Sequence, residues 1–189
     1  MGAVLYIEAP KPFVGGHLAD PDSVIATHEP VSKTAGRSIV VFLGGGITGC
    51  WDWQTRAVTL LNLKYAAAQT AAKRPLRDLV ILNPRRASFP MDDVNAAREQ
   101  IAWEHENLHK ADVHVFFFAS TSQSEQPITL FEYGYWLGQP KSELVVGIEP
   151  GFLRRQDVEI QTVLERDDVV IHDTLDAVCD GVIKALVEW

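Results

Sequence analysis

The stretch SIVVFLGG, residues 38–45, contains an unbroken run of apolar side chains from Ile39 to Leu43 and ends in glycine. A strand with one face in water alternates apolar and polar residues, whereas a strand covered on both faces reads as a continuous apolar run. Residues 38–45 therefore predict a strand in the interior of a parallel sheet.

Residues 1–37 are interrupted by Pro, Gly and Asp, so we expect an N-terminal arm there, in which AVLYIEAP, residues 3–10, is a candidate edge strand.

The same pattern repeats along the rest of the chain, where each apolar run is followed by a stretch with helical spacing. Predicted strands cover residues 38–45, 78–84, 112–120, 143–149 and 168–173. Predicted helices cover residues 51–73, 93–111, 128–138, 154–166 and 174–189. This alternation is typical of an α/β fold with helices on both faces of a parallel sheet. We therefore expect one α/β domain over residues 38–189, with a sheet of about five strands.

The composition limits the size class and the partners. With 189 residues, of which 47% are hydrophobic, the chain is long enough for one well-buried domain. Its formal net charge is -8, whereas a surface that binds polymeric nucleic acid clusters Lys and Arg to displace counterions. We therefore expect no polymeric nucleic acid as a partner and favour a small-molecule ligand.

Cysteine content and hydropathy bear on the compartment. The two cysteines, Cys50 and Cys179, are far apart and lack the spacing of a metal site, which favours a reducing compartment while leaving a disulfide open. We identify no secretory signal and no segment near the roughly 20 apolar residues that a membrane span needs. The expectation is a cytoplasmic protein without membrane contact.

Glycines follow the first interior strand, in FLGGGITG, residues 42–49. Ligands of parallel α/β sheets bind outside the carboxyl ends of the strands, where the strand order reverses. The glycines suit either a tight strand-to-helix turn or the close approach of a ligand to backbone N–H groups. Their spacing matches neither G-x-G-x-x-G nor a P-loop, which disfavours a dinucleotide or a triphosphate.

Asn83, Arg85 and Arg86 follow the second interior strand in NPRR, residues 83–86. Asn83 offers both a donor and an acceptor, and arginine binds anions through paired N–H groups. For the arginines, the favoured interpretation is a turn with solvated side chains.

Polar residues also gather on the helix predicted before the third interior strand. His105 and His109 share a helical face, as a metal pair would, but the following residues offer no convincing third ligand, so no metal site is predicted. Glu104 lies beside Trp103 near the buried stripe of this helix, and it is either a functional carboxylate or an ordinary surface glutamate.

The most specific stretch is PITLFEYGYWLG, residues 127–138. We expect a helix that begins near the proline and buries Ile128, Leu130 and Phe131. Glu132 is expected in its first turn, pointing toward the strand ends. The helix N-terminus would stabilise its charge, whereas apolar neighbours would oppose ionisation. A charged but poorly solvated carboxylate is a competent nucleophile, and the alternative is a capping or ion-paired glutamate.

Four stretches together resemble the nucleoside 2-deoxyribosyltransferase family, in its nucleoside 2-deoxyribosyltransferase-like branch. They are VFLGGGITGCWDW (41–53), LNPRR (82–86), WEHENLHKADVHVFFF (103–118) and PITLFEYGYW (127–136). The similarity covers roughly residues 38–150 and follows the order of the elements. It implies a flavodoxin-like three-layer fold, and a reaction at the glycosidic bond of a 2′-deoxynucleoside.

In that family a glutamate attacks C1′ and releases the base, and a second base then attacks the covalent deoxyribosyl-enzyme. No metal or redox cofactor is needed. The resemblance assigns the nucleophile to Glu132 and the carboxylate that binds a sugar hydroxyl to Glu104. The substrate-binding candidates are Gly44, Gly45, Asn83, Arg85, Asp92, Trp103 and Gln126. Because active sites in the family are often completed by a neighbouring subunit, we also expect a homo-oligomer.

One position departs from the family. The aspartate that lies six residues before the nucleophile in better-known members is Gln126 here. Glutamine can bind a base edge but cannot act as a general acid, so Glu125, Asp92 or solvent would have to supply the proton.

Three functional hypotheses remain. The first is deoxyribosyl transfer, with a small nucleoside or nucleotide and a free nucleobase as partners. The second is hydrolysis of a (deoxy)nucleoside or nucleoside 5′-monophosphate by the same Glu132, and Arg85 or Arg86 near the sugar would favour the nucleotide. The third is a non-catalytic nucleoside- or nucleotide-binding protein.

Overall fold

Six parallel strands form one sheet in the computed structural model of the chain, which describes residues 2–11, 38–90, 93–121 and 123–188. The strand order across the sheet is β1-β3-β2-β4-β5-β6. In chain order, the strands are Val4–Glu8 (β1), Ile39–Gly45 (β2), Leu79–Asn83 (β3), Val113–Phe118 (β4), Glu143–Ile148 (β5) and Ile171–His172 (β6).

Helices occupy the connections between the strands from β2 onward, and one follows the last strand. In the described ranges they are Trp53–Ala71 (α1), Ala96–Lys110 (α2), Pro127–Leu137 (α3), Arg155–Glu165 (α4) and Leu175–Glu188 (α5). None of these helices is long and apolar enough to cross a lipid bilayer.

The structure confirms the predicted α/β class and the parallel sheet, with one strand more than the expected five. The additional strand is β1, which pairs with β3 and confirms the candidate edge strand of residues 3–10. Residues 12–37 of the expected N-terminal arm lie outside the described residues. The strand predicted over residues 168–173 is shorter than expected, because only Ile171 and His172 pair with β5. Asp168 lies before this strand, and its carboxylate accepts hydrogen bonds from the guanidinium of Arg166.

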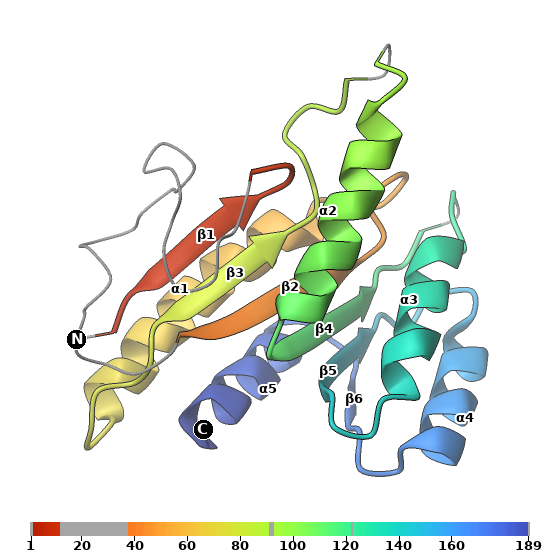
Figure 1. Ribbon diagram of the computed structural model, residues 1–189. Helices are drawn as coiled ribbons and strands as arrows, with labels where there is room; N and C mark the ends of the chain where they lie inside the picture. Colours follow the sequence, from red (N-terminus) through yellow and green to blue (C-terminus); the bar gives the residue numbers. More distant parts are fainter. Residues whose placement is uncertain (1, 12–37, 91–92, 122, 189) are drawn as a thin grey trace.

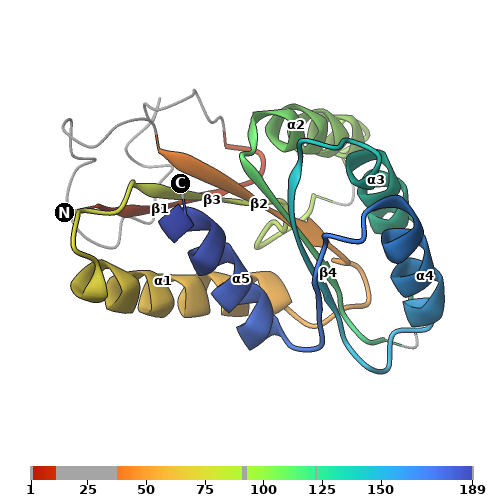
Figure 2. The same ribbon diagram turned by 90° about the horizontal axis from the view of Figure 1, so that it is seen from below.

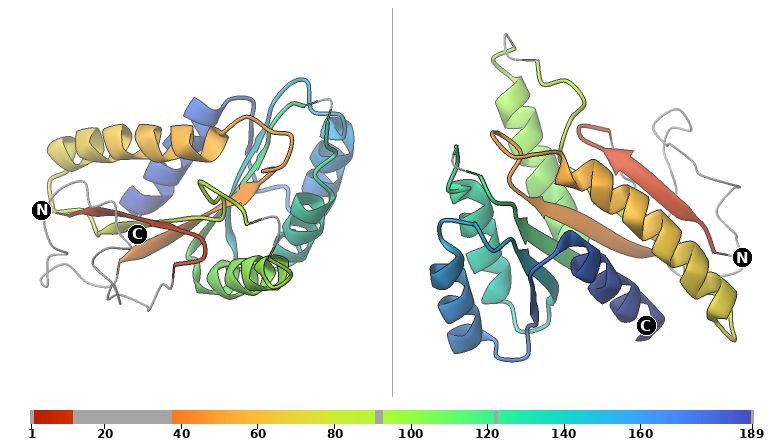
Figure 3. Two further views of the ribbon diagram at one scale, coloured as in Figure 1. Left: turned by 90° about the horizontal axis from the view of Figure 1, so that it is seen from above. Right: turned by 180° about the vertical axis from the view of Figure 1, so that it is seen from behind.

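The helices form two layers on opposite faces of the sheet. Helices α2, α3 and α4 cover the near face in Figure 1, and α1 and α5 cover the far face, as Figures 2 and 3 show edge-on and from behind. Val41 and Phe117 belong to the apolar core under α1 and α5, whereas Phe42 and Phe116 belong to the core under α2, α3 and α4. Neighbouring side chains of one strand thus enter different cores, which explains the unbroken apolar runs.

The strand order places a switch point at the centre of the sheet. Apart from β1, the order β3-β2-β4-β5-β6 is that of a flavodoxin-like fold. The chain leaves β2 toward β3 on one side, and the strands from β4 onward extend to the other. The carboxyl ends of β2 and β4, which are neighbours in the sheet, are therefore where a ligand site is expected.

Candidate active site

A cavity of about 360 Å³ opens at the carboxyl ends of β2 and β4, beside the switch point. Residues 44–48, at the end of β2 and directly after it, form one wall, residues 126–129 at the start of α3 form another, and Ile101 of α2 lies at a third. Glu104 of α2 and Glu132 of α3 are the charged residues among the described ones that line it. A concave site with few polar groups on largely apolar walls is typical of small-molecule binding.

Glu132 reaches this cavity from the second turn of α3. The helix begins at Pro127 and has no acidic residue in its first turn, so the predicted first-turn position was wrong. Because the influence of a helix N-terminus fades within about one turn, it does not offset the loss of solvent. Burial, followed by the charge of Glu104, raises the pKa of Glu132 from 4.5 to about 7.

Glu104 shares the cavity but has different neighbours. Nε2 of Gln100 donates a hydrogen bond to Oε1 of Glu104 at 2.7 Å. Burial is the largest influence and raises the pKa of Glu104, and the bond from Gln100 and the positive charge of Arg86 oppose that rise without reversing it. Both carboxyl groups thus have raised pKa values, but Glu104 has a hydrogen-bond donor and a nearby cation, whereas the charge of Glu104 adds to the effect of burial on Glu132. Such different surroundings suit the two groups to different roles in one reaction.

Gln126 lines the cavity, but the backbone engages its amide group. Oε1 accepts a hydrogen bond from the N–H of Gly46 at 2.9 Å, and Nε2 donates to the carbonyl of Ala119 at 2.7 Å. The residue is 3% exposed and has a φ of 52°. The side chain considered from the sequence for binding a base edge thus ties the loop after β2 to the end of β4.

Gly44 and Gly45 also line the cavity, and the second explains why β2 ends in glycine. Gly45 has a φ of 155°. A Cβ atom there would clash with the carbonyl oxygen of Phe117 and with the ring of Trp53. The tight turn after β2 therefore requires glycine at position 45. The other interpretation from the sequence, the close approach of a ligand to the backbone, applies to the same residues, because Gly44 and Gly45 line the cavity.

Arg85, a predicted substrate-binding residue, does not line the cavity. Its Nε donates to Oε1 of Gln54 at 2.8 Å, and its Nη2 donates to the carbonyl oxygens of Ile47 and Trp51 at 3.2 and 3.1 Å. A carboxylate oxygen of Asp52 lies 3.3 Å from the same Nε. The guanidinium thus fixes the shape of the loop after β2. The favoured expectation of solvated arginine side chains was wrong, because those of Arg85 and Arg86 are only 17% and 7% exposed.

Asn83 and Trp103 likewise contribute beside the cavity and not to its lining. Asn83 is buried, and its Nδ2 donates to the hydroxyl of Tyr6 at 2.7 Å. Trp103 is buried, and its Nε1 donates to the carbonyl of Lys11 at 2.7 Å. Asp92, the remaining candidate, lies outside the described residues.

The outer face of α3 differs from the prediction. Ile128 and Phe131, which were expected to be buried, are 66% and 76% exposed, and Leu130 is partly buried. The buried face instead consists of Thr129, Tyr133 and Leu137. Residues four apart share a helical face whereas sequence neighbours do not. The closely spaced apolar residues 128, 130 and 131 therefore predicted the wrong buried face of the helix.

Sequence reasoning missed Gln100, which binds Glu104 from one turn away. The signal was present, since residues four apart on a helix are neighbours, but a glutamine at that spacing is common on solvated faces. The hydroxyl-bearing lining residues Thr48, Ser124 and Thr129 also went unnoticed.

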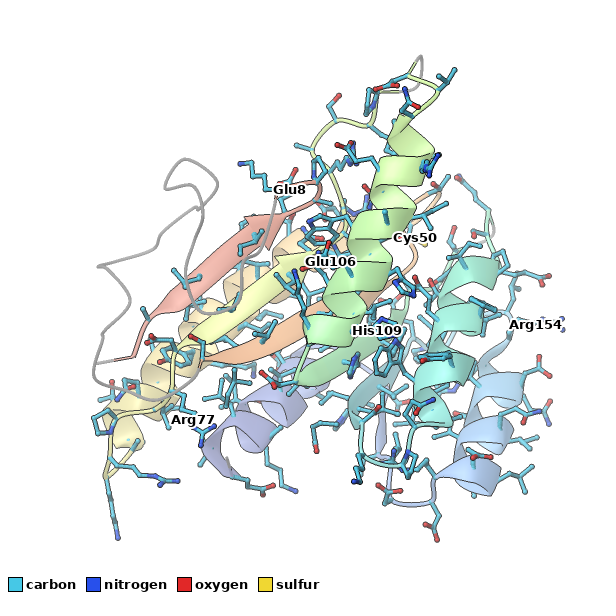
Figure 4. All side chains as sticks on the ribbon, in the orientation of Figure 1. Glu8, Cys50, Arg77, Glu106, His109 and Arg154 are labelled. Atoms are coloured by element: carbon cyan, nitrogen blue, oxygen red, sulfur yellow. The ribbon has the colours of Figure 1, made fainter. Side chains whose placement is uncertain are left out.

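His105 and His109 are exposed on α2 and lie outside the cavity lining. Their ring centroids are 4.4 Å apart, and Figure 4 shows His109 on the side of α2 toward α3, where it contacts Tyr135 and Trp136. In the described ranges, no group of three or more His, Cys, Asp or Glu residues is arranged to hold a metal ion.

The fold and the cavity define an α/β protein with a flavodoxin-like parallel sheet and two carboxyl groups in a cavity at its switch point. The chain belongs to the nucleoside 2-deoxyribosyltransferase-like family, whose sequence model matches residues 38–152 and so includes both Glu104 and Glu132. A search of curated proteins finds no match to the chain.

Proposed function

We propose that the protein transfers a 2-deoxyribosyl group between nucleobases through a covalent intermediate on Glu132. The observation that carries the proposal is the poorly solvated carboxyl group of Glu132, which shares a cavity at the switch point with Glu104. Membership of the family supports a deoxynucleoside and a free nucleobase as the reactants.

In the first displacement, a carboxylate oxygen of Glu132 attacks C1′ of the deoxynucleoside. A C–O bond forms as the glycosidic C–N bond breaks, and the electron pair of that bond leaves with the base nitrogen, which takes up a proton. Glu104 has one carboxylate oxygen bound by Gln100. Its other oxygen accepts a hydrogen bond from a sugar hydroxyl and holds C1′ in line with Glu132.

In the second displacement, a nitrogen of the incoming base attacks C1′ from the vacated side. The new C–N bond forms, the C–O bond to Glu132 breaks, and the glutamate leaves as a carboxylate while the incoming base releases a proton to solvent. Two displacements retain the configuration at C1′. Apolar walls limit the access of water, which favours capture by a base over hydrolysis.

The proton for the leaving base comes from solvent or from Asp92, which lies outside the described residues. Glu125 does not line the cavity, and its Oε2 lies 3.3 Å from Nε of Arg154. Glutamine at position 126 cannot donate a proton as a general acid, and its amide is already bound to the backbone.

A neutral nucleoside fits the cavity better than a 5′-monophosphate. Arg85 binds the loop after β2, and Arg86 binds Gln100 and Glu99. In the described part of the chain, neither arginine lines the cavity, whose charged groups are both carboxyls. A phosphate dianion there would meet like charge without a compensating cation.

We also propose that the protein forms a homo-oligomer through the outer face of α3. Ile128, Phe131 and Tyr135 are 66%, 76% and 50% exposed, and their spacing places them along one side of the helix. Exposed apolar patches of this kind are typical of interaction sites. Because Ile128 and Ile101 also line the cavity, a subunit packed here would cover its mouth.

The nucleophile is tested with Glu132→Ala. We expect transfer between a deoxynucleoside and a free base to fall by a factor of roughly 10⁴ or more, with the far-ultraviolet circular dichroism unchanged. Mass spectrometry of the wild type with deoxynucleoside should show a deoxyribosyl adduct on the peptide that contains residue 132. The control is Glu106→Ala, which removes an exposed carboxylate of α2 that pairs with Lys110.

An adduct on another residue, or full activity of Glu132→Ala, would exclude this mechanism. Omitting the acceptor base separates transfer from hydrolysis, because a transferase then accumulates the adduct while a hydrolase releases base continuously. Binding of deoxynucleoside without turnover or adduct would instead indicate a non-catalytic binding protein.

A further inference from the structure

A chain of hydrogen bonds leads from the loop after β3 to the carboxyl group of Glu104. Nε of Arg86 donates to Oε1 of Gln100 at 2.6 Å. Nε2 of Gln100 donates both to the carbonyl oxygen of Pro84 and to Oε1 of Glu104, each at 2.7 Å. The outer end of the chain is Glu99, whose carboxylate accepts from Nη2 of Arg86 at 3.0 Å.

These contacts leave the amide of Gln100 with one orientation. Its oxygen faces the guanidinium of Arg86, which only donates, and its nitrogen faces the carbonyl of Pro84, which only accepts. A flipped amide would oppose donor to donor and acceptor to acceptor. Gln100 therefore presents an N–H group to Glu104. Because Arg86 and Pro84 bind the two ends of the Gln100 amide, that amide in turn fixes the position of the Glu104 carboxylate.

The anchor of this chain is well shielded from solvent. The side chain of Arg86 is 7% exposed, whereas that of Glu99 is 58% exposed. A hydrogen bond to a charged group is stronger and more directional than one between neutral groups. The fixed point of the arrangement is therefore the Arg86 guanidinium, and Gln100 transmits its position to the cavity.

We propose that Gln100 is a positioning residue for the reaction at Glu132. Its amide occupies Oε1 of Glu104, which leaves Oε2 as the free acceptor for a sugar hydroxyl and sets the place of C1′ relative to the nucleophile. The inference rests on the proposed function, because it assigns Gln100 a role in that same site. Gln100 acts through Glu104 and does not itself line the cavity.

The hydrogen bond from Gln100 also affects the ionisation of Glu104. The charged groups that act on this part of the site are Arg86 and Glu132, which face Glu104 from the loop after β3 and from α3. Removing the Gln100 donor destabilises the ionised form of Glu104. The state in which both carboxyl groups are ionised would then form at a higher pH than in the wild type.

The test is Gln100→Met, which keeps the length and the approximate volume of the side chain but removes the amide. We expect kcat/KM for transfer to fall by about 10- to 100-fold, as for other residues that orient a ligand-binding group, through both weaker substrate binding and a lower kcat. The acid limb of the kcat/KM profile should move to higher pH, a change that a merely structural role would not produce. In the ligand-free protein, ¹³C NMR should show the carboxyl group of Glu104 titrating at higher pH.

The matched control is Glu106→Gln, which neutralises an exposed carboxylate of the same helix that pairs with Lys110 and leaves the chain from Arg86 to Glu104 in place. We expect its kcat/KM and its pH profile to match those of the wild type. Gln100→Asn, whose amide is one methylene too short to span the same partners, is the second variant should Gln100→Met fail to fold. It should shift the profile in the same direction.

The inference can be separated from the proposed function. In a Glu132→Ala background no turnover is expected, and calorimetry there should show that adding Gln100→Met weakens deoxynucleoside binding about tenfold. Weakened binding supports the positioning role of Gln100 even if the wild type forms no adduct. The absence of an adduct would contradict only the proposed reaction. Unchanged binding together with an unshifted Glu104 titration would overturn the role of Gln100.

Discussion

Glu132 and Glu104 project into one cavity from neighbouring helices, yet their surroundings act on the two carboxyl groups differently. Glu104 receives a hydrogen bond from Gln100 and lies near the charge of Arg86. Burial and the negative charge of Glu104 together raise the pKa of Glu132 to about 7. A carboxylate that is poorly solvated when ionised loses little hydration on attacking carbon, which suits a nucleophile.

The raised pKa of Glu132 predicts the pH dependence of the reaction. Only the ionised carboxylate attacks C1′, so kcat/KM should rise with pH up to about 7 and level off above it. On the acid side, the rate should fall about tenfold per pH unit. Steady-state rates between pH 5 and 9 test this, with the stability of the protein checked at each pH; a limb centred near the ordinary pKa of glutamate would contradict the burial of Glu132.

Single residues were predictable from the sequence when their chemistry conflicts with their immediate neighbours. Glu132 was singled out because a carboxylate lies among apolar residues in the sequence, and it lines the cavity. The structural partners of Gln126 and Arg85 were not foreseen because they are distant in the sequence: Gly46 lies 80 residues from Gln126, and Gln54 lies 31 residues from Arg85. Local sequence shows that such groups can bind something, but not whether the fold already supplies the partner.

At the scale of elements, the site depends on two loops that are tied together. The loop after β2 is held from outside by Arg85, and from inside by Gln126 at the start of α3. Gln126 sits in the left-handed region, with a φ of 52°, a conformation that a non-glycine residue adopts at some cost. The two backbone bonds of its buried amide offset that cost and fix the start of α3 against the strand ends.

Gln126→Ala should therefore weaken the protein and loosen the cavity. The substitution leaves the N–H of Gly46 and the carbonyl of Ala119 without partners in a buried region, which costs about 1–3 kcal/mol. Urea unfolding followed by tryptophan fluorescence measures this loss. The control is Gln123→Ala, which truncates an exposed side chain of the same loop and should leave the midpoint unchanged; equal midpoints for the two variants would refute the structural role of Gln126.

Elements with strong patterns were predicted well, and those with mixed patterns less so. The interior strands were visible because side chains on both faces are buried, which forces an unbroken apolar run. β6 is only two residues long. The segment predicted as this strand contains an apolar residue that is not buried, Val170, which is 65% exposed. The face of α3 was misread because apolar residues surround that helix, so periodicity alone does not choose the buried side.

The whole molecule has two helical layers with unequal outer surfaces. Over α2, α3 and α4, several large apolar residues face solvent: Ile101, Ile128, Phe131, Tyr135, Ile160, Val163 and Leu164. Over α1 and α5, the exposed large apolar residues in the described ranges are Leu63 and Val187. Single exposed apolar residues are normal, but a concentration of them on one layer is typical of an interaction surface. The sequence predicted association only through the family resemblance, because exposure depends on the packing of the layers.

Phe131→Asp tests whether this layer joins subunits. If copies pack through the outer face of α3, the substitution places an unpaired carboxylate in a desolvated contact and should raise the dissociation constant by roughly 30-fold or more. Sedimentation velocity over a range of protein concentrations measures the shift. Leu63→Asp is the matched control, because Leu63 is 65% exposed on α1 in the opposite layer and its replacement should leave the oligomer intact.

The same substitution should affect activity, because Ile128 belongs both to the exposed apolar stripe of α3 and to the cavity lining. Transfer by the Phe131→Asp variant should be lower at dilute protein and should recover as the protein concentration rises. A wild type that sediments as a monomer at every concentration would show that the apolar stripe of α3 serves another purpose.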